Sequence, residues 1–130
     1  MFENRNIKIA QQMTVRQIQE EFNKAYPYLK IEFFSKPHQK NGASPKNLIV
    51  QKSKTLGECR TIHNEGEITI TPQMIVADLE QNFMDVYGLS VQVFRKSGNA
   101  WLETTITDGW TLEKQNLQGE VLSKKSTEAE

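Results

Sequence analysis

A chain of 130 residues with 16 basic and 16 acidic side chains is long enough to bury one hydrophobic core. Apolar residues make up 37% of it, and no run of them approaches the roughly 18 residues that cross a bilayer, which argues against a membrane protein. A single cysteine, Cys59, excludes an internal disulfide framework and fits a reducing compartment. The N-terminus lacks the apolar stretch of a secretory signal, so we expect a cytoplasmic protein.

The first predicted elements recur 61 positions later in the chain. Residues 7–26 align with residues 68–87, and seven of the 20 pairs are identical. In the first copy, the identical residues are Ile7, Ile9, Gln12, Met13, Val15, Phe22 and Tyr26. Most of them are apolar or aromatic, so the repeat copies a buried face and not a catalytic motif.

The first copy predicts a strand, a helix and a second strand. Alternating apolar residues over 7–9 indicate the first strand. Thr14 and Gln17 form a capping box, which predicts that an amphipathic helix over 14–26 begins there. Alternation returns over 29–33 and predicts the next strand. A long connection over 35–47 then leads to a short predicted strand at 48–50.

The second copy follows the same plan and then adds a hairpin. A strand over 68–70 precedes a helix over 75–87, and Gly88 supplies a left-handed stop before another strand. Ile75 stands where the first copy has its capping threonine, so this helix lacks a hydroxyl cap. A turn at 96–99 and a Thr-rich strand over 101–107 complete the predicted hairpin.

One local motif resembles a known family. The segment Asp108-Gly109-Trp110-Thr111-Leu112, followed by Asn116-Leu117-Gln118, is similar to the stretch before the last strand of ubiquitin-like β-grasp proteins. In outline the resemblance covers residues 66–122, and it implies a β-grasp-like scaffold of the kind that commonly serves as a binding module. The chain does not end in the Gly-Gly of conjugated modifiers, so a covalent-modifier role is not implied. In the first copy, Thr55-Leu56-Gly57-Glu58 is the candidate counterpart of this motif.

We therefore predict an α+β fold made by internal duplication of a β-α-β-β unit. Two helices pack on a mainly antiparallel sheet in a β-grasp-like arrangement, and a ferredoxin-like sheet is the alternative. The two interlocked repeats, about 1–62 and 66–122, form a single domain over 1–122. The polar and charged segment 123–130 is expected to be a disordered tail.

Reactive groups are sparse in this sequence. Cys59 and His63 are four residues apart and would share a face of a helix, which makes a thiol enzyme one hypothesis. The residues around His63 argue against a helix there, and a lone cysteine is usually a small buried side chain. One cysteine and two distant histidines offer no metal-ligand spacing, and we expect no metal and no cofactor.

Charge and aromatic side chains give the remaining candidates. Residues 1–60 hold 11 basic and 5 acidic side chains, while residues 61–130 hold 5 and 11, so the two halves are oppositely charged. The basic side chains gather between Lys36 and Arg60, where they could contact phosphates. The candidate interaction surface consists of Lys36, Lys40, Lys46, Lys52, Lys54, Arg60, Phe34, Phe94, Trp101 and Trp110.

The leading functional hypothesis is a non-catalytic protein-binding or assembly module with a protein partner or self-association. It depends on the duplicated scaffold, the opposite charges of its halves and the lack of a reactive constellation. Weak nucleic-acid binding through residues 36–60 is the second hypothesis, and a thiol enzyme using Cys59 is the third.

Overall fold

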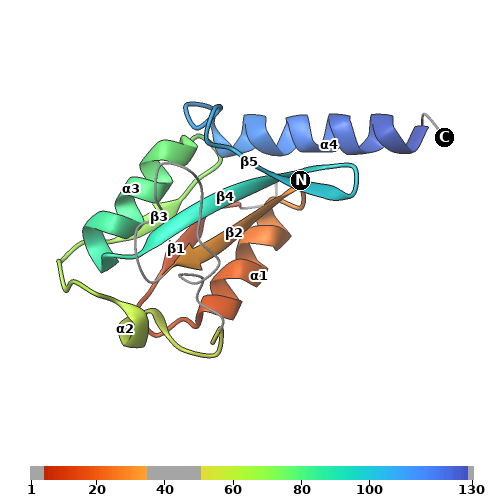
Figure 1. The fold of residues 1–130 in the computed structure, drawn as a ribbon. Helices are drawn as coiled ribbons and strands as arrows, with labels where there is room; N and C mark the ends of the chain where they lie inside the picture. The colour runs from red at the N-terminus through yellow and green to blue at the C-terminus, as the bar shows by residue number, and fades with distance from the viewer. Residues whose placement is uncertain (1–4, 35–50, 129–130) are drawn as a thin grey trace.

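The computed structural model describes residues 5–34 and 51–128 (Figure 1). Its elements, in chain order, are β1 (Ile7–Ile9), α1 (Val15–Ala25), β2 (Leu29–Phe34), α2 (Leu56–Cys59), β3 (Ile68–Ile70), α3 (Val76–Tyr87), β4 (Ser90–Ser97), β5 (Ala100–Glu103) and α4 (Leu112–Glu128). Helices and antiparallel strands are both present, which confirms the α+β class. The connection over 35–47 and the strand over 48–50 lie outside the described residues.

Strands of one half pair with strands of the other half. β1 pairs with β3 in a two-stranded sheet, and β2 pairs with β4, which also pairs with β5. Every described pair is antiparallel. Neither half therefore completes its own sheet among the described residues.

In both sheets, a central residue of one strand pairs with the residue at the corresponding place in the other half of the chain. In the first sheet the central pair is Lys8 with Thr69, which are 61 residues apart. In the second sheet a central pair is Glu32 with Gln92. Glu32 is the fourth residue of the alternating stretch that begins at Leu29, and Gln92 is the fourth residue of the one that begins at Leu89. Residues at corresponding places in the two halves thus pair with each other in both sheets. The finer β-grasp-like and ferredoxin-like topologies stay predictions.

The same backbone hydrogen bonds recur at the start of α1 and at the start of α3. Leu56 N–H donates to the Met13 carbonyl at 3.0 Å, and Leu112 N–H donates to the Met74 carbonyl at 2.9 Å. A single bridge accompanies each pair, Thr14 with Thr55 and Ile75 with Thr111. The Thr-Leu pairs at 55–56 and 111–112 therefore occupy corresponding places.

The predicted ends of the helices are confirmed. Thr14 caps α1 through a capping box: its hydroxyl accepts from Gln17 N–H at 3.0 Å. The corresponding residue of α3, Ile75, makes no side-chain capping bond. Gly88 ends α3 with φ 66°, in the left-handed region that favours glycine, and a Cβ there would collide with the Thr61 hydroxyl.

A single apolar core connects both sheets with α1 and α3. Its largest buried side chains come in equivalent pairs, since Phe22 contacts Tyr26 at 5.4 Å between ring centroids and Phe83 contacts Tyr87 at 6.3 Å. Phe33 of β2 meets Phe83 edge to face, which joins the first half to the second. The repeated apolar positions therefore build a shared core.

The C-terminal segment differs from our expectations. The β-grasp resemblance implies a strand after residues 116–118, and the composition predicts a disordered tail from Ser123. Instead α4 runs as one helix to Glu128, and its C-terminal end extends beyond the sheet (Figure 1). The Thr-rich strand is also shorter than predicted, since β5 ends at Glu103, and Thr104 is held to the Val93 carbonyl by its N–H and its hydroxyl.

Polar groups attach α4 to the end of the sheet. Gln115 accepts from Arg95 Nη1 at 2.8 Å, Asn116 accepts from Tyr28 N–H at 2.8 Å, and Ser123 accepts from Gly98 N–H at 3.2 Å. Gly119 permits the close approach, since a Cβ there would lie 2.8 Å from Tyr28 Cβ. Sequence periodicity could not reveal this helix, because its buried face is largely polar. Among the described residues, none of the helices has the length and apolar character of a membrane span.

Candidate interaction surface

Three of the predicted surface residues lie on the sheet face opposite α1 and α3. Strand register places Phe34 and Phe94 on that face, as predicted from their parity. Trp101 of β5 lies on the same face, opposite Lys96. The Lys30 ammonium is 5.2 Å from the Phe94 ring centroid and 5.1 Å from that of Trp101. These two half-buried rings therefore form one cation–π cluster, whereas Phe34 is buried with 3% exposure.

Trp110 lies apart from that cluster, at the start of α4. Its ring carries two cations, with Lys114 Nζ at 4.3 Å and the Arg95 guanidinium carbon at 5.7 Å from the centroid. Arg95 also donates to Gln115, while its Nε is buried without a hydrogen-bond partner. Trp110 thus belongs to the contact between α4 and the sheet. The structure does not bring Trp110 together with Trp101.

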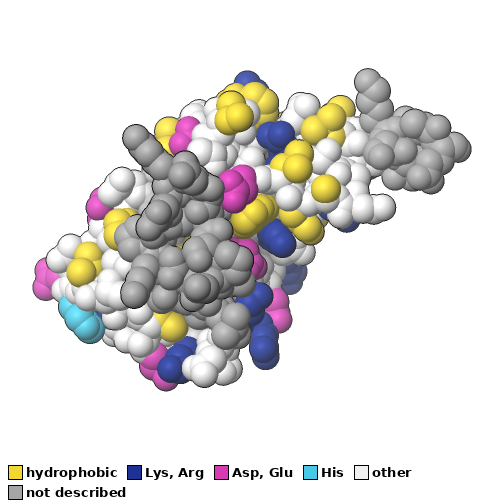
Figure 2. All heavy atoms as spheres, viewed as in Figure 1, with side chains coloured by type: hydrophobic (Ala, Val, Ile, Leu, Met, Phe, Trp, Pro, Cys, Tyr) yellow, Lys and Arg dark blue, Asp and Glu magenta, His cyan; other side chains and the backbone are white. Residues whose placement is uncertain are grey.

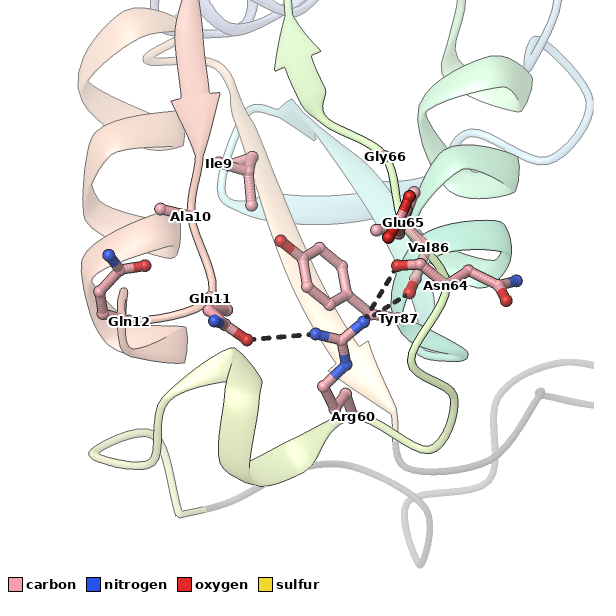
Figure 3. Close-up of a pocket in the computed structure, with 10 residues that line it drawn as sticks. All are labelled: Ile9, Ala10, Gln11, Gln12, Arg60, Asn64, Glu65, Gly66, Val86 and Tyr87. Carbon is pink, nitrogen blue, oxygen red and sulfur yellow. Dashed lines mark hydrogen bonds between the residues drawn. The ribbon is translucent and has the colours of Figure 1, made fainter.

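Arg60 follows α2 and lies in a shallow pocket, where Figure 3 shows its bonds to Gln11, Asn64 and Val86. Its Nε donates to Ile62 O at 2.8 Å and Nη1 donates to Gln11 Oε1 at 3.2 Å. Nη2 reaches Asn64 O at 3.3 Å and Val86 O at 3.1 Å. The guanidinium also stacks over Tyr87, 4.9 Å from the ring centroid. A cation at the C-terminal carbonyls of α3 complements the helix dipole, so the structure gives Arg60 a stabilising role.

The other predicted basic residues are dispersed or undescribed. Lys52 lies 3.8 Å from Glu32 on the same sheet face as Phe34. Lys54 is exposed, and its carbonyl accepts from Val15 N–H. The remaining predicted members, Lys36, Lys40 and Lys46, lie outside the described residues.

The predicted thiol site has an unfavourable cysteine. Cys59 is the last residue of α2 and packs against the core, and burial raises the pKa of its thiol. A nucleophilic cysteine requires the opposite shift. His63 lies on the exposed segment after α2. Among residues 5–34 and 51–128, no three His, Cys, Asp or Glu side chains are grouped so that they could hold a metal.

Glu80 is the carboxyl most altered by its surroundings, and sequence reasoning did not single it out. Burial, chiefly, raises its pKa to about 7, and the charges of Asp108 and Glu103 add to this rise. The Val93 N–H donates to the Glu80 carboxylate at 3.4 Å, and this hydrogen bond offsets part of the rise in pKa. Glu80 therefore links α3 to β4 just beyond the end of β5. Its equivalent in α1 is Gln19.

The directions of the β4 hydrogen bonds fix which groups of β5 face outward. Lys96 N–H donates to Tyr28 O, toward β2. Thr104 N–H donates to Val93 O, on the other side of β4. Backbone groups alternate between the two sides of a strand. In consequence, the backbone groups of Arg95 and Ser97 bond to β5. Their partners on β5 are Leu102 and Ala100.

Trp101 and Glu103 therefore direct their backbone N–H and C=O groups away from β4. No strand within the described parts of the chain pairs with this side of β5. The Leu102 side chain beside it is 43% exposed. β5 thus offers a short open edge with two donors and two acceptors.

The opposite edge of the same sheet is occupied. On β2, Leu29 and Ile31 direct their carbonyls outward. Asn23 Nδ2 donates to Leu29 O at 2.9 Å, and Gln19 Nε2 donates to Ile31 O at 2.8 Å. Two side chains of α1 thus use the acceptors that an added strand would need. Of the two edges, the β5 edge is the one left open among the described residues.

Exposed apolar side chains gather on the C-terminal third of the chain. Ile106 is 99% exposed in the loop after β5, and Leu117 and Val121 are more than half exposed on the face of α4 opposite its polar contacts. Figure 2 shows hydrophobic side chains along α4. Exposed apolar surface of this kind is typical of protein contact sites. The Thr-rich composition of 101–107 indicated a strand there, but no sequence signal identified which edge is open.

The comparisons with known proteins add no relative. No family model, no curated protein and no solved structure matches this chain.

Proposed function

We propose that this chain is a non-catalytic protein-binding or assembly module that adds an extended strand to the open edge of β5. One observation carries the proposal: the outward N–H and C=O groups of Trp101 and Glu103 have no strand partner among the described residues, while the β2 edge is closed by α1. Addition of a strand at such an edge gives affinity through backbone bonds and specificity through alternate side chains.

The side chains around the edge suit this role. Leu102 offers an exposed apolar contact on one face of β5, and Trp101 with Lys30 offers an aromatic and cationic contact on the other. Aromatic side chains are enriched at protein interfaces, where a rigid ring covers much area at a low entropy cost.

The test is a selection from a displayed library of unstructured peptides, performed in parallel on the wild type and on Glu103→Pro. Proline removes the outward N–H of residue 103 and leaves the bonds of Leu102 and Ala100 to β4 intact. Peptides enriched on the wild type should bind at least tenfold more weakly to Glu103→Pro. Glu103→Thr, which retains the N–H, should keep most of the binding. A selection that enriches no peptide, or enriches peptides insensitive to Glu103→Pro, contradicts the proposal.

A further inference from the structure

We infer that the strand added to the β5 edge is β5 of a second copy of this chain, in an antiparallel register centred on Leu102. This inference rests on the proposed function and names its partner. The result is a twofold dimer with a continuous six-stranded sheet, in which β5 of each copy lies at the centre. The twofold relation between copies repeats the symmetry that already relates the halves of one chain.

The hydrogen bonds favour this register. With Leu102 opposite Leu102 of the second copy, Trp101 of one copy faces Glu103 of the other. Both residues direct their backbone groups outward, so each such pair exchanges two bonds. All eight outward groups of the two copies are then satisfied. A shift of one residue would place Trp101 opposite Leu102, whose backbone groups already bond to β4.

The side chains agree with the same register. The two Leu102 side chains, each 43% exposed in one copy, meet on one face as a pair without hydrogen bonds, where Cα atoms lie closest, about 4.5 Å apart. On the other face, Trp101 lies beside Glu103 of the second copy. Contact between two leucines removes apolar surface from water on both copies.

Charge favours the antiparallel direction. The Trp101 end of β5 is flanked by Lys96, which is paired with Trp101 and lies on the same face of the sheet. The other end carries Glu103, with Asp108 close enough for both to act on Glu80. Antiparallel pairing brings the basic end of each strand to the acidic end of the other. Parallel pairing would align like charges.

The size of the contact sets the strength of the dimer. β5 has four residues, so the paired strands alone bury less than the roughly 1,200 Å² of a standard stable interface. We therefore expect a weak dimer that is populated at hundreds of micromolar. The concentration series must extend that far.

The first measurement is sedimentation velocity of the full chain from about 10 µM to 1 mM. The weight-average mass should rise toward twice the monomer mass. Glu103→Pro should weaken dimerisation at least tenfold, whereas Ile106→Lys, at a fully exposed site after β5, should leave it within about twofold. NMR spectra of the backbone amides of each variant check that the fold is retained.

The second measurement tests the register by disulfide formation in a Cys59→Ser background. Leu102→Cys should form an intermolecular disulfide, because the two Cα atoms lie within bridging distance. Ala100→Cys is the matched control, since it is also exposed on β5 but would face residue 104 of the second copy. That cysteine should cross-link at least tenfold more slowly.

These outcomes separate the inference from the proposed function. A mass that stays monomeric at 1 mM overturns the dimer, as does a dimer that is insensitive to Glu103→Pro or cross-links equally at residues 100 and 102. If the chain is monomeric but peptides bind at the same edge, the proposed function stands with another partner. If neither a dimer nor an edge-bound peptide is found, both fail.

Discussion

Glu80 illustrates how one substitution between equivalent positions changes the chemistry of a contact. In α1 the equivalent Gln19 donates its amide to β2 at no cost in charge. In α3 a carboxyl occupies the same place, and its pKa is about 7 in the folded protein against 4.5 as the ordinary value. The folded state therefore binds more protons than the unfolded state between these pH values. The free energy of unfolding falls as the pH rises through this window.

Glu80→Gln should remove this dependence. The neutral amide can still accept from Val93 N–H, and the free energy of unfolding at pH 8 should rise by at most about 3 kcal/mol. At pH 4 the variant and the wild type should differ little. Urea unfolding across this pH range measures the effect, with Glu21→Gln on the exposed surface of α1 as the control. An unchanged pH dependence between about 4.5 and 7 would contradict the assignment to Glu80.

Arg60 is a second residue whose role follows from geometry alone. A lysine at this position cannot reproduce a planar fork that donates to four acceptors and stacks on Tyr87. Arg60→Lys should lower the free energy of unfolding by about 1–3 kcal/mol. Arg16→Lys, the same change at an exposed position of α1, should have little effect in the same urea titration. Equal unfolding midpoints for both variants would show that the Arg60 contacts contribute nothing.

At the scale of elements, the caps of α1 and α3 follow from the sequence, and the structure confirms both. Capping depends on residues within one turn, so Thr14 with Gln17, and Gly88, can be recognised without knowledge of the fold. Helix α4 could not be recognised in the same way. Its contacts with Tyr28 and Arg95 join residues far apart in sequence, so only the folded chain reveals them.

The missing cap of α3 leads to a prediction about stability. Ile75→Thr supplies a hydroxyl that can accept from Asp78 N–H, as Thr14 accepts from Gln17 N–H. The free energy of unfolding should rise by about 0.5–1 kcal/mol. Ile75→Val is the matched control, because valine has the shape of threonine without its hydroxyl. If the thermal midpoints of the two variants coincide, the hydroxyl does not cap α3.

The candidate surface was predicted less completely than the elements. Parity along a strand placed Phe34 and Phe94 on the correct face, because alternation is a local property. The open edge of β5 depends on which strands become neighbours, and that is decided by pairing between the two halves. Arg60 was chosen for its charge, but its acceptors come from three separate segments. Local patterns do not report such convergence.

At the scale of the molecule, the pairing of β1 with β3 and β2 with β4 makes each half depend on the other. Separate fragments 1–65 and 66–130 should not fold as monomers, because each leaves a strand edge and one side of the core uncovered. Circular dichroism and sedimentation should find each fragment unfolded or self-associated, and an equimolar mixture should recover the helical signal of the intact chain. A fragment that is a folded monomer would contradict this dependence.

The symmetric register has a consequence for which residues can occupy its axis. In a dimer of identical chains, any residue on the twofold axis meets itself, so a charged side chain there meets its own charge. This chain places Lys8 against Thr69 and Glu32 against Gln92. Each central pair thus holds one charged and one neutral partner. Covalent joining of the halves is what permits a lysine and a glutamate at positions where two separate identical subunits would repel each other.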